Sequence, residues 1–187
     1  MVSKKNRKAQ MQMSVGTIVT IVLLMTVLIL GLVLVRNIFG SATKIVDLTD
    51  AQLTEEVNKL FGEDKRVVVY PASRRLEIEQ TEIDGFGIGI KNLLPNVGQN
   101  TFSYEIVVSD PDLQSKCGVN ENTVLSWMVV GRAENNIPIP VGGKSTQRVL
   151  LDIPKGSSLC TFRLRVNVNS EQGPYESEFM DITIKAK

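Results

Sequence analysis

The spacing of hydrophobic and polar positions changes twice along this chain. Residues 15–35 form an uncharged apolar run, interrupted only by two glycines and by the hydroxyl groups of Thr17, Thr20 and Thr26. Over residues 50–61, apolar residues recur at the three- and four-residue intervals of one helix face, and farther on they recur at every second position. The pattern therefore predicts a long apolar helix, a short amphipathic helix and a β domain, in that order.

The apolar run is long enough to cross a lipid bilayer. At about 1.5 Å per residue, a helix over residues 15–35 is about 31 Å long, which matches the hydrocarbon layer. A buried core helix is the alternative, but the rest of the chain shows no helical partners to enclose one. A cleaved secretory signal is disfavoured, because the run is long and no small-x-small site follows it closely. We predict a retained transmembrane helix over residues 14–37.

The basic residues before this helix predict its orientation. Lys4, Lys5, Arg7 and Lys8 precede the run, and no acidic residue lies among them. The positive-inside rule therefore places the tail, residues 1–13, in the cytoplasm. Everything after the helix is then extracytoplasmic, which predicts a cytoplasmic-membrane protein with its N-terminus inside.

The charge of the outer part argues against one class of partner. Five of the 21 basic residues precede residue 37, whereas all 20 acidic residues follow it. The near-neutral whole chain thus combines a basic tail with an outer part of net charge about −4, which disfavours nucleic acid as a partner.

The short helix, residues 50–61, lies in a predicted juxtamembrane linker, residues 38–65. Thr49 and Gln52 form a capping-box pattern, and Gly62 supplies a stop signal. The apolar face can lie on the membrane surface, meet a copy of itself or pack on the following domain. Its polar face is acidic, which disfavours an anionic lipid surface, so packing on the domain is our prediction. The apolar positions are Leu53, Val57, Leu60 and Phe61.

Residues 66–187 predict an all-β sandwich as the ectodomain. Short apolar or alternating runs follow one another there, separated by Pro, Gly, Asn and Asp. The run CTFRLRVNVNS alternates between polar and apolar residues, which predicts one solvated and one buried face. In GFGIGI, one face carries Phe86, Ile88 and Ile90 and the other only glycines, which leaves room for a packed neighbour. VNENTVLSWMVV fits a strand or a capped helical turn that starts near Asn122.

Cys117 and Cys160 are the only cysteines, and the chain has no histidine. A metal site would therefore lack its usual nitrogen or sulfur ligands, and none is predicted. A disulfide between the two cysteines is favoured over two separate buried thiols, because the domain is expected outside the cytoplasm. This disulfide would close the long loop between Cys117 and Cys160, which would stabilise the fold by about 4 kcal/mol on the chain-entropy model.

One motif resembles part of a nucleotide-binding loop. GGKST, residues 142–146, ends like a phosphate-binding P-loop. Pro138 stands where the first glycine of that loop should be, and a strand is expected to follow instead of a helix. An ordinary loop before a strand is therefore the better interpretation.

The carboxylates do not form a pattern that predicts catalysis. Glu55 and Glu56 fall on the polar side of the short helix, and Asp110 and Asp112 lie in a turn, SDPD, that caps its own backbone. A calcium site there would need more oxygen donors. No nucleophile stands beside a plausible base, so we predict no catalytic residue, no cofactor and no small-molecule substrate.

The β region resembles extracytoplasmic immunoglobulin-like adhesion or interaction modules. GIGIKNLLPNVGQNTFSYEIVVSDPD looks like their strand–loop–strand unit, and IPVGGKSTQRVLLDIPKGSSLCTFRLRVNV looks like their closing hairpin region. The resemblance covers residues 66–187 and rests on layout. It implies an immunoglobulin-like sandwich fold and names no ligand.

The N-terminus resembles that of archaeal type IV pilin-like precursors, which carry a class III signal. In RKAQM, Lys8 matches the charged residue before the processing site, Ala9 the small residue at it and Gln10 the first mature residue. The resemblance covers residues 1–36. It departs from the family pattern because alanine replaces the more usual glycine and because two polar residues, Gln12 and Ser14, delay the apolar run.

Together these features predict a non-enzymatic, single-pass surface protein that is anchored in the membrane. It would present its β-sandwich for binding or assembly, with membrane lipid around its helix and another copy or a different surface protein as its partner. The alternative is a pilin-like filament subunit, processed between Ala9 and Gln10.

Overall fold

The computed structural model divides the chain into two compact units, Met1–Ala42 and Thr43–Lys187. The predicted basic tail, residues 1–13, lies outside the described side chains. Backbone is described for residues 7–40, 44–95 and 98–187, and side chains for residues 16–33, 44–95 and 98–187.

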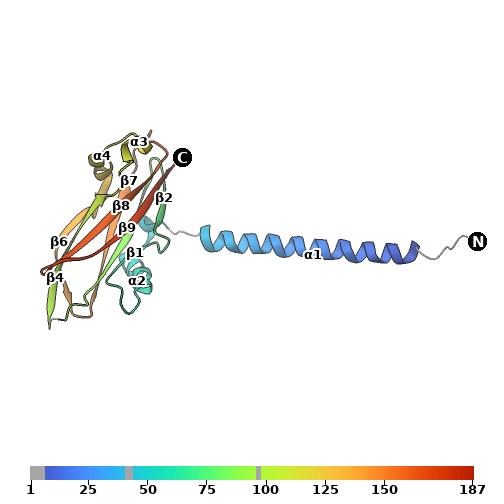
Figure 1. Cartoon of the computed structure of the whole chain (residues 1–187), viewed down its shortest axis with the longest axis horizontal. Coiled ribbons are helices and arrows are strands. Elements are labelled where there is room, and N and C mark those ends of the chain that lie inside the picture. The colour runs from blue at the N-terminus through green and yellow to red at the C-terminus, as the bar shows by residue number, and fades with distance from the viewer. Residues whose placement is uncertain (1–6, 41–43, 96–97) are drawn as a thin grey trace, which may run out of the picture. The chain divides into compact units, whose positions relative to one another are not determined.

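The first unit is one α-helix, α1, which spans Arg7–Gly40 (Figure 1). Its segment Gly16–Val33 is long and apolar enough to cross a membrane, and every side chain of that segment is exposed. Thr20 and Thr26 donate their hydroxyl hydrogens to carbonyls of the preceding turn, each at 2.8 Å, so these hydroxyls are satisfied inside the helix. The apolar helix is confirmed, and in its described part it is not a core helix of this chain.

The second unit begins with two short helices. A 3₁₀ helix, η1, spans Ile45–Asp47, and α2 spans Asp50–Leu60. The predicted capping box is present: Gln52 N donates to Thr49 Oγ1 at 3.3 Å, and Thr49 N donates to Gln52 Oε1 at 2.9 Å. Two backbone donors at the start of α2 are thereby satisfied, which explains why the helix begins here.

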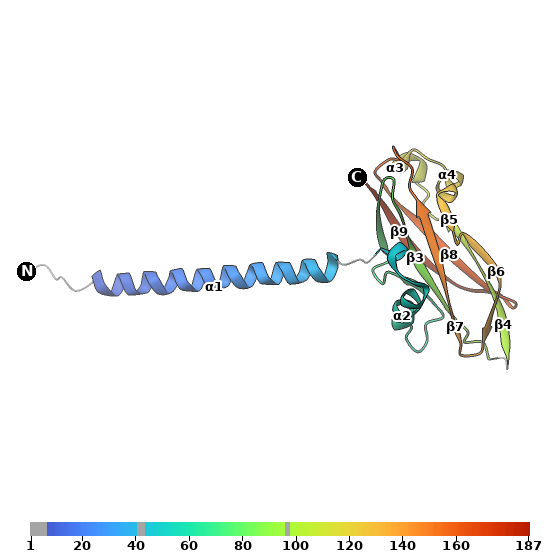
Figure 2. The same cartoon turned by 180° about the vertical axis from the view of Figure 1, so that it is seen from behind.

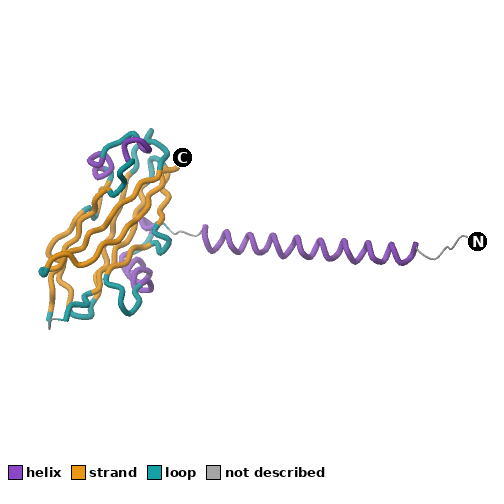
Figure 3. The backbone as a smooth tube through the Cα atoms, in the orientation of Figure 1, coloured by secondary structure: helices purple, strands orange, loops and turns teal. Residues whose placement is uncertain are grey.

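Two sheets follow and pack face to face as a β-sandwich (Figure 3). The first has the order β1-β3-β7-β5, and the second has the order β2-β9-β8-β4-β6. The strands of the first sheet are β1 (Val67–Tyr70), β3 (Ile83–Lys91), β7 (Lys144–Asp152) and β5 (Met128–Val130). Those of the second are β2 (Arg75–Glu79), β9 (Gly173–Lys185), β8 (Thr161–Ser170), β4 (Gln99–Val108) and β6 (Ala133–Pro140).

The core lies between the sheets and comes from alternating strand positions. In β8 the predicted alternation is confirmed, because Phe162, Leu164 and Val166 are buried and the arginines between them are exposed. The indole ring of Trp127 is also buried, with its centroid 6.1 Å from that of the Phe162 ring. Two short helices, α3 (Leu113–Cys117) and α4 (Glu121–Ser126), gather at one end of the sandwich (Figure 1).

The neighbour expected on the glycine face of β3 is α2 (Figure 2). A Cβ atom at Gly87 would lie 2.9 Å from Leu53 Cδ1, and one at Gly89 would lie 2.5 Å from Val57 Cγ1. The glycines thus let the apolar face of α2 approach the backbone of β3. Of the three positions considered for the amphipathic face, packing on the domain is the one that the structure shows.

Three local features differ from the sequence expectations. The ambiguous run forms both alternatives in succession, since α4 is capped by Asn120 instead of Asn122 and is followed by β5. Strand β6 was not expected, because its prolines and polar residues obscure the apolar alternation. It lies at a sheet edge, where Pro138 is tolerated. Strand β2 pairs with β9 in parallel, which joins segments far apart in sequence.

Candidate binding surface

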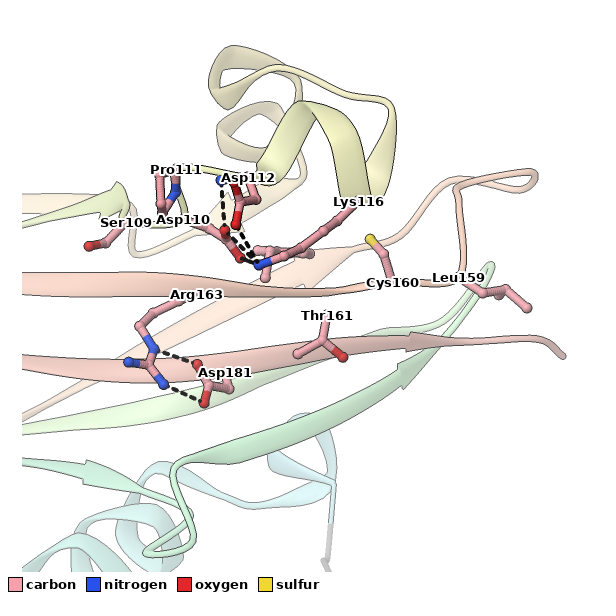
Figure 4. Close-up of a pocket in the computed structure, with 11 residues that line it drawn as sticks. Ser109, Asp110, Pro111, Asp112, Lys116, Leu159, Cys160, Thr161, Arg163 and Asp181 are labelled. Carbon is pink, nitrogen blue, oxygen red and sulfur yellow. Dashed lines mark hydrogen bonds and ion pairs between the residues drawn. The ribbon is translucent and has the colours of Figure 1, made fainter.

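A cleft of about 690 Å³ lies beside α3, at the end of β8 where that strand begins (Figure 4). It combines the turn after β4, Lys116 in the last turn of α3, the start of β8 and one residue of β9, so four segments contribute to it. Its lining residues are Ser109, Asp110, Pro111, Asp112, Lys116, Leu159, Cys160, Thr161, Phe162, Arg163 and Asp181.

The SDPD turn positions the carboxylates of this cleft. As predicted, the turn caps its own backbone, with Asp112 N donating to Asp110 Oδ1 at 3.0 Å. Lys116 Nζ lies 3.0 Å from Asp110 Oδ1 and 3.7 Å from Asp112 Oδ2. The hydrogen bond from Lys116 lowers the pKa of Asp110 and raises the pKa of Lys116. This side of the cleft therefore carries two carboxylates and one ammonium group, and Lys116 pairs with both aspartates.

The predicted disulfide between Cys117 and Cys160 is present next to the cleft. Cys117 ends α3 and Cys160 directly precedes β8, and their Cα atoms lie 5.4 Å apart. The bond fixes the short helix to the first residues of the strand. It also holds Leu159 next to the cleft, where that side chain is 59% exposed.

The other side of the cleft continues onto the outer face of the five-stranded sheet. Arg163 forms a two-point ion pair with Asp181, with Nε–Oδ1 and Nη2–Oδ2 distances of 2.7 and 2.9 Å. This pairing raises the pKa of Arg163. The guanidinium carbon atoms of Arg163 and Arg74 lie 4.2 and 4.9 Å from the centroid of the Phe179 ring, so two cations contact one aromatic side chain.

Two further arginines lie on this face without a partner in the described part of the chain. Strand pairing places Arg75 opposite Asp181 and Arg165 opposite Phe179, and both side chains are exposed. We call the four arginines around Phe179 the arginine patch: Arg74, Arg75, Arg163 and Arg165. Its acidic neighbours Asp181 and Glu178 each pair with one of its members, so Arg75 and Arg165 have no ion pair among the described residues, and exposed Glu77 and Glu105 lie on the same outer face.

The charged side chains of this surface are suited to recognising a charged partner. Thr161 Oγ1 shares a hydrogen bond with Thr183 Oγ1 at 2.9 Å, and the carboxylates of the cleft already accept from lysine or arginine. Among the described residues, no group of three or more His, Cys, Asp or Glu side chains could hold a metal ion. The arrangement offers cations, carboxylates and one aromatic ring to a partner, and no activated nucleophile.

A second cluster fixes the chain where it enters the sandwich. Arg148 Nη1 donates to the carbonyl of Ile45 at 2.9 Å, and its Nη2 donates to the carbonyl of Leu48 at 2.6 Å and to Asp50 Oδ1 at 3.0 Å. The buried carboxylate of Asp84 accepts from Ile45 N at 2.9 Å, and burial raises the pKa of Asp84. We call residues 44–50 the junction segment; these two side chains hold it against β3 and β7.

The remaining sequence-predicted residues are not brought into either cluster. The backbone of Lys8, Ala9 and Gln10 lies in α1, and their side chains lie outside the described residues. Glu55 and Glu56 both form ion pairs with Lys59 on the outer side of α2. The last three residues of GGKST already belong to β7, so the motif leads into a strand and not into a helix.

Sequence reasoning missed the residues that build these clusters. Arg148, Asp84, Phe179 and Asp181 gave no motif, because their partners come from the junction segment or from neighbouring strands. The one available signal was the alternation in β8, which predicted that Arg163 would lie on the outer face.

Comparisons with known proteins add little beyond the fold. No family model and no curated protein sequence matches the chain. Among solved structures it is similar to a PapD-like domain of human CEP192, with 10% identity and a TM-score of 0.39 over 65% of this chain and 85% of that one. It is also similar to murine CRIg, with 8% identity and a TM-score of 0.35 over 66% of this chain and 99% of that one.

An enzyme also appears among the similar structures. A family 123 glycoside hydrolase from Clostridium perfringens shows 7% identity and a TM-score of 0.40, over 60% of this chain and 22% of the hydrolase. The chain thus spans less than a quarter of that enzyme's length. Similarities at this level carry no argument about activity. The two packed sheets themselves confirm the expected all-β sandwich, and none of these comparisons supports a relation to pilins.

Proposed function

We propose that this chain is a single-pass protein of the cytoplasmic membrane, with its N-terminus inside, that presents its β-sandwich outside for binding or assembly. The observation that carries the proposal is the exposed apolar surface of α1. Every side chain of Gly16–Val33 is exposed, and that segment is uncharged. Such a surface is stable in the hydrocarbon layer and costly in water.

Two further observations support the extracytoplasmic placement of the sandwich. A disulfide persists in an oxidising compartment and is rare in the cytosol, and both cysteines of this chain form one. The basic residues before the apolar run favour a cytoplasmic N-terminus by the positive-inside rule.

Binding is favoured over catalysis by the chemistry of the cleft. Its lysine and arginine side chains are paired with aspartates, and its threonine hydroxyl bonds to another threonine. Such groups recognise charged or hydrogen-bonding partners, but none is activated as a nucleophile by an adjacent base. We therefore propose a non-enzymatic role.

Topology reporters test the placement directly. A reporter that is active only outside the cytoplasm, fused after Lys187, should give a strong signal, whereas one that is active only in the cytoplasm should not. Replacing Lys4, Lys5, Arg7 and Lys8 with glutamine should reduce the outside signal, because the charge difference across the apolar run is removed. A C-terminus that reads as cytoplasmic in the natural sequence would refute the proposal.

A pilin-like filament subunit is the second candidate. The observation that favours it is the length of α1, whose 34 residues exceed what a bilayer crossing needs. At about 1.5 Å per residue the helix is about 51 Å long, so part of it lies beyond the hydrocarbon layer. A subunit of this kind would be cut between Ala9 and Gln10 before assembly.

N-terminal sequencing of the protein recovered from membranes separates the two candidates. The membrane-anchor proposal expects Met1 or Val2 as the first residue, because no processing is required. Gln10 as the first residue would favour the filament subunit. A variant with Ala9→Trp, which a protease that requires a small residue should not cleave, provides the matched control for the second outcome.

A further inference from the structure

Strand β5 covers only one end of its neighbour β7, which leaves the rest of that edge of the four-stranded sheet open. β5 pairs with Leu150 and Leu151, at the end of β7. The chain then leaves the sheet at Gly131, where a φ of 75° turns the backbone. The carbonyl of the next residue, Arg132, already accepts a hydrogen bond from β4 of the other sheet at 3.0 Å. In the described part of the chain, no strand pairs with this edge over residues 144–148.

The backbone groups on this open edge point away from β3. In an antiparallel pair, the N–H and C=O groups of successive residues point alternately to the two sides of a strand. Asp152 N donates to the carbonyl of Trp127 at 2.8 Å, on the side of β5. Since the register of β7 with β3 is unbroken, the same side carries the backbone groups of Arg148, Thr146 and Lys144. The edge therefore presents a row of donors and acceptors that another strand can pair with.

Two other sheet edges are protected against such pairing. In β6 the alternation turns Pro138 and Pro140 outward, where they offer no N–H group to a further strand. In β1 the outward N–H group of Val67 already donates to Glu176 Oε2 at 3.0 Å. β7 contains no proline, so its open edge lacks this protection.

A cleft of about 350 Å³ adjoins the open edge. Thr146, Gln147 and Arg148 of β7 line it, together with residues of α2 and β6. Helix α2 packs on the outer face of the four-stranded sheet, and β6 belongs to the sheet on its inner face, so the two flank the edge from opposite sides. A single extended chain fits between these flanks, whereas the edge of a second folded sheet would bring its own packed layers against them.

We propose that the open edge of β7 binds an extended segment of a different protein as an added strand. The added strand would continue the line of β5 beyond Gly131. Its backbone would supply the hydrogen bonds, and its side chains would point alternately toward Leu53 of α2 and toward Tyr104 and Ala133. The described extended segments of this chain are already strands of its two sheets, so another protein is the occupant. This inference names the partner class for the binding role proposed above and rests on that role.

Selection of random short peptides displayed on phage, with the full-length chain in mild detergent as the target, tests the inference. The most enriched peptide is synthesised, and its affinity is measured for the natural chain and for Thr146→Pro. The substitution removes the outward N–H group and places a ring on the edge, so binding should weaken at least about tenfold. Because this N–H group has no strand partner in the described part of the chain, the melting temperature should stay the same.

Thr146→Val is the matched control, because valine keeps the backbone N–H group and the branched shape of threonine. It should bind the peptide as the natural chain does. Loss of binding with both variants would mean that the threonine side chain, and not strand pairing, holds the peptide, which would overturn the inference.

A second measurement needs no substitution in the protein. Methyl groups are placed on the backbone nitrogens of every second peptide residue, in either of the two alternating sets. One set should weaken binding at least about tenfold and the other should not, since only one edge of an added strand faces β7. Bound peptide should also slow hydrogen exchange at the amides of Thr146 and Arg148, whereas that of Gln147, which faces β3, should be slow without it.

Several other outcomes would overturn the inference. One is that no peptide is enriched, and another is that the enriched peptide binds Thr146→Pro as tightly as the natural chain. Equal effects of the two methylated sets would exclude strand pairing. Self-association of the natural chain that Thr146→Pro abolishes would make a second copy the occupant in place of a different protein. None of these results bears on the topology reporters, so the placement of the sandwich is tested separately.

Discussion

Cys160→Ala lowers the free energy of unfolding of the second unit by about 2–4 kcal/mol. The bond joins residues 43 apart in sequence, and without it the unfolded chain regains the freedom of that long loop. The native state also loses the link between α3 and the start of β8. Because a domain of this size is usually stable by about 5–15 kcal/mol, the loss is a large share of the total.

Denaturant titration of the full-length chain in detergent, followed by Trp127 fluorescence, measures this loss. The indole packs against Phe162, two residues beyond Cys160, so its emission reports on the region that the disulfide holds. The natural chain with reductant should show the same lowered midpoint as the variant. Ser158→Ala is the control, because Ser158 is exposed in the same loop and forms no bond that would be lost. Equal midpoints with and without reductant would contradict the expectation.

Arg148→Ala is expected to destabilise the second unit by about 2–3 kcal/mol and to free the junction segment. The guanidinium donates to two backbone carbonyls and one carboxylate, and only 19% of its side chain is exposed. Removing it leaves the carbonyl of half-buried Leu48 without this donor, and it takes from the carbonyl of buried Ile45 one of two donors, the other being Leu48 N. Each such loss costs about 1–3 kcal/mol when water cannot replace the bond.

Hydrogen exchange locates this effect. In the Arg148→Ala variant, the backbone amides of α2 should exchange faster, whereas those of β8 should keep their protection under native conditions. The reason is that Arg148 anchors the segment that leads into α2 and makes no contact with β8. Arg165→Ala is the control, because Arg165 has no partner among the described residues and its loss should change neither stability nor exchange. Equal exchange of α2 in the natural chain and in Arg148→Ala would show that the apolar face alone holds the helix.

The two clusters of this domain, one at the junction segment and one at the cleft and arginine patch, have different roles. Arg148 and Asp84 hold the junction segment on the four-stranded sheet through hydrogen bonds to its backbone. The cleft and the arginine patch lie on the five-stranded sheet and carry the charges that remain available to a partner. A change in one cluster should therefore leave the chemistry of the other intact.

Features that depend on neighbouring residues could be predicted from the sequence. The apolar helix required only a long uncharged run, and the start of α2 required only Thr49 and Gln52, whose capping bonds are local. The alternation in β8 predicted its two faces, because side chains of a strand point to opposite sides in turn. The glycines of β3 predicted a close neighbour, since a face without side chains leaves space that packing fills.

The tertiary structure alone decided which distant residues meet. β6 escaped prediction because its strand character comes from pairing with β4 at an edge, where prolines are allowed. The parallel pairing of β2 with β9, which brings Arg75 to Asp181, has no local signal. Arg148 and Asp84 looked like ordinary polar strand residues until the junction segment was placed over them. Their roles depend on contacts about 40 to 100 residues away in sequence, and a short-range pattern holds no information about such contacts.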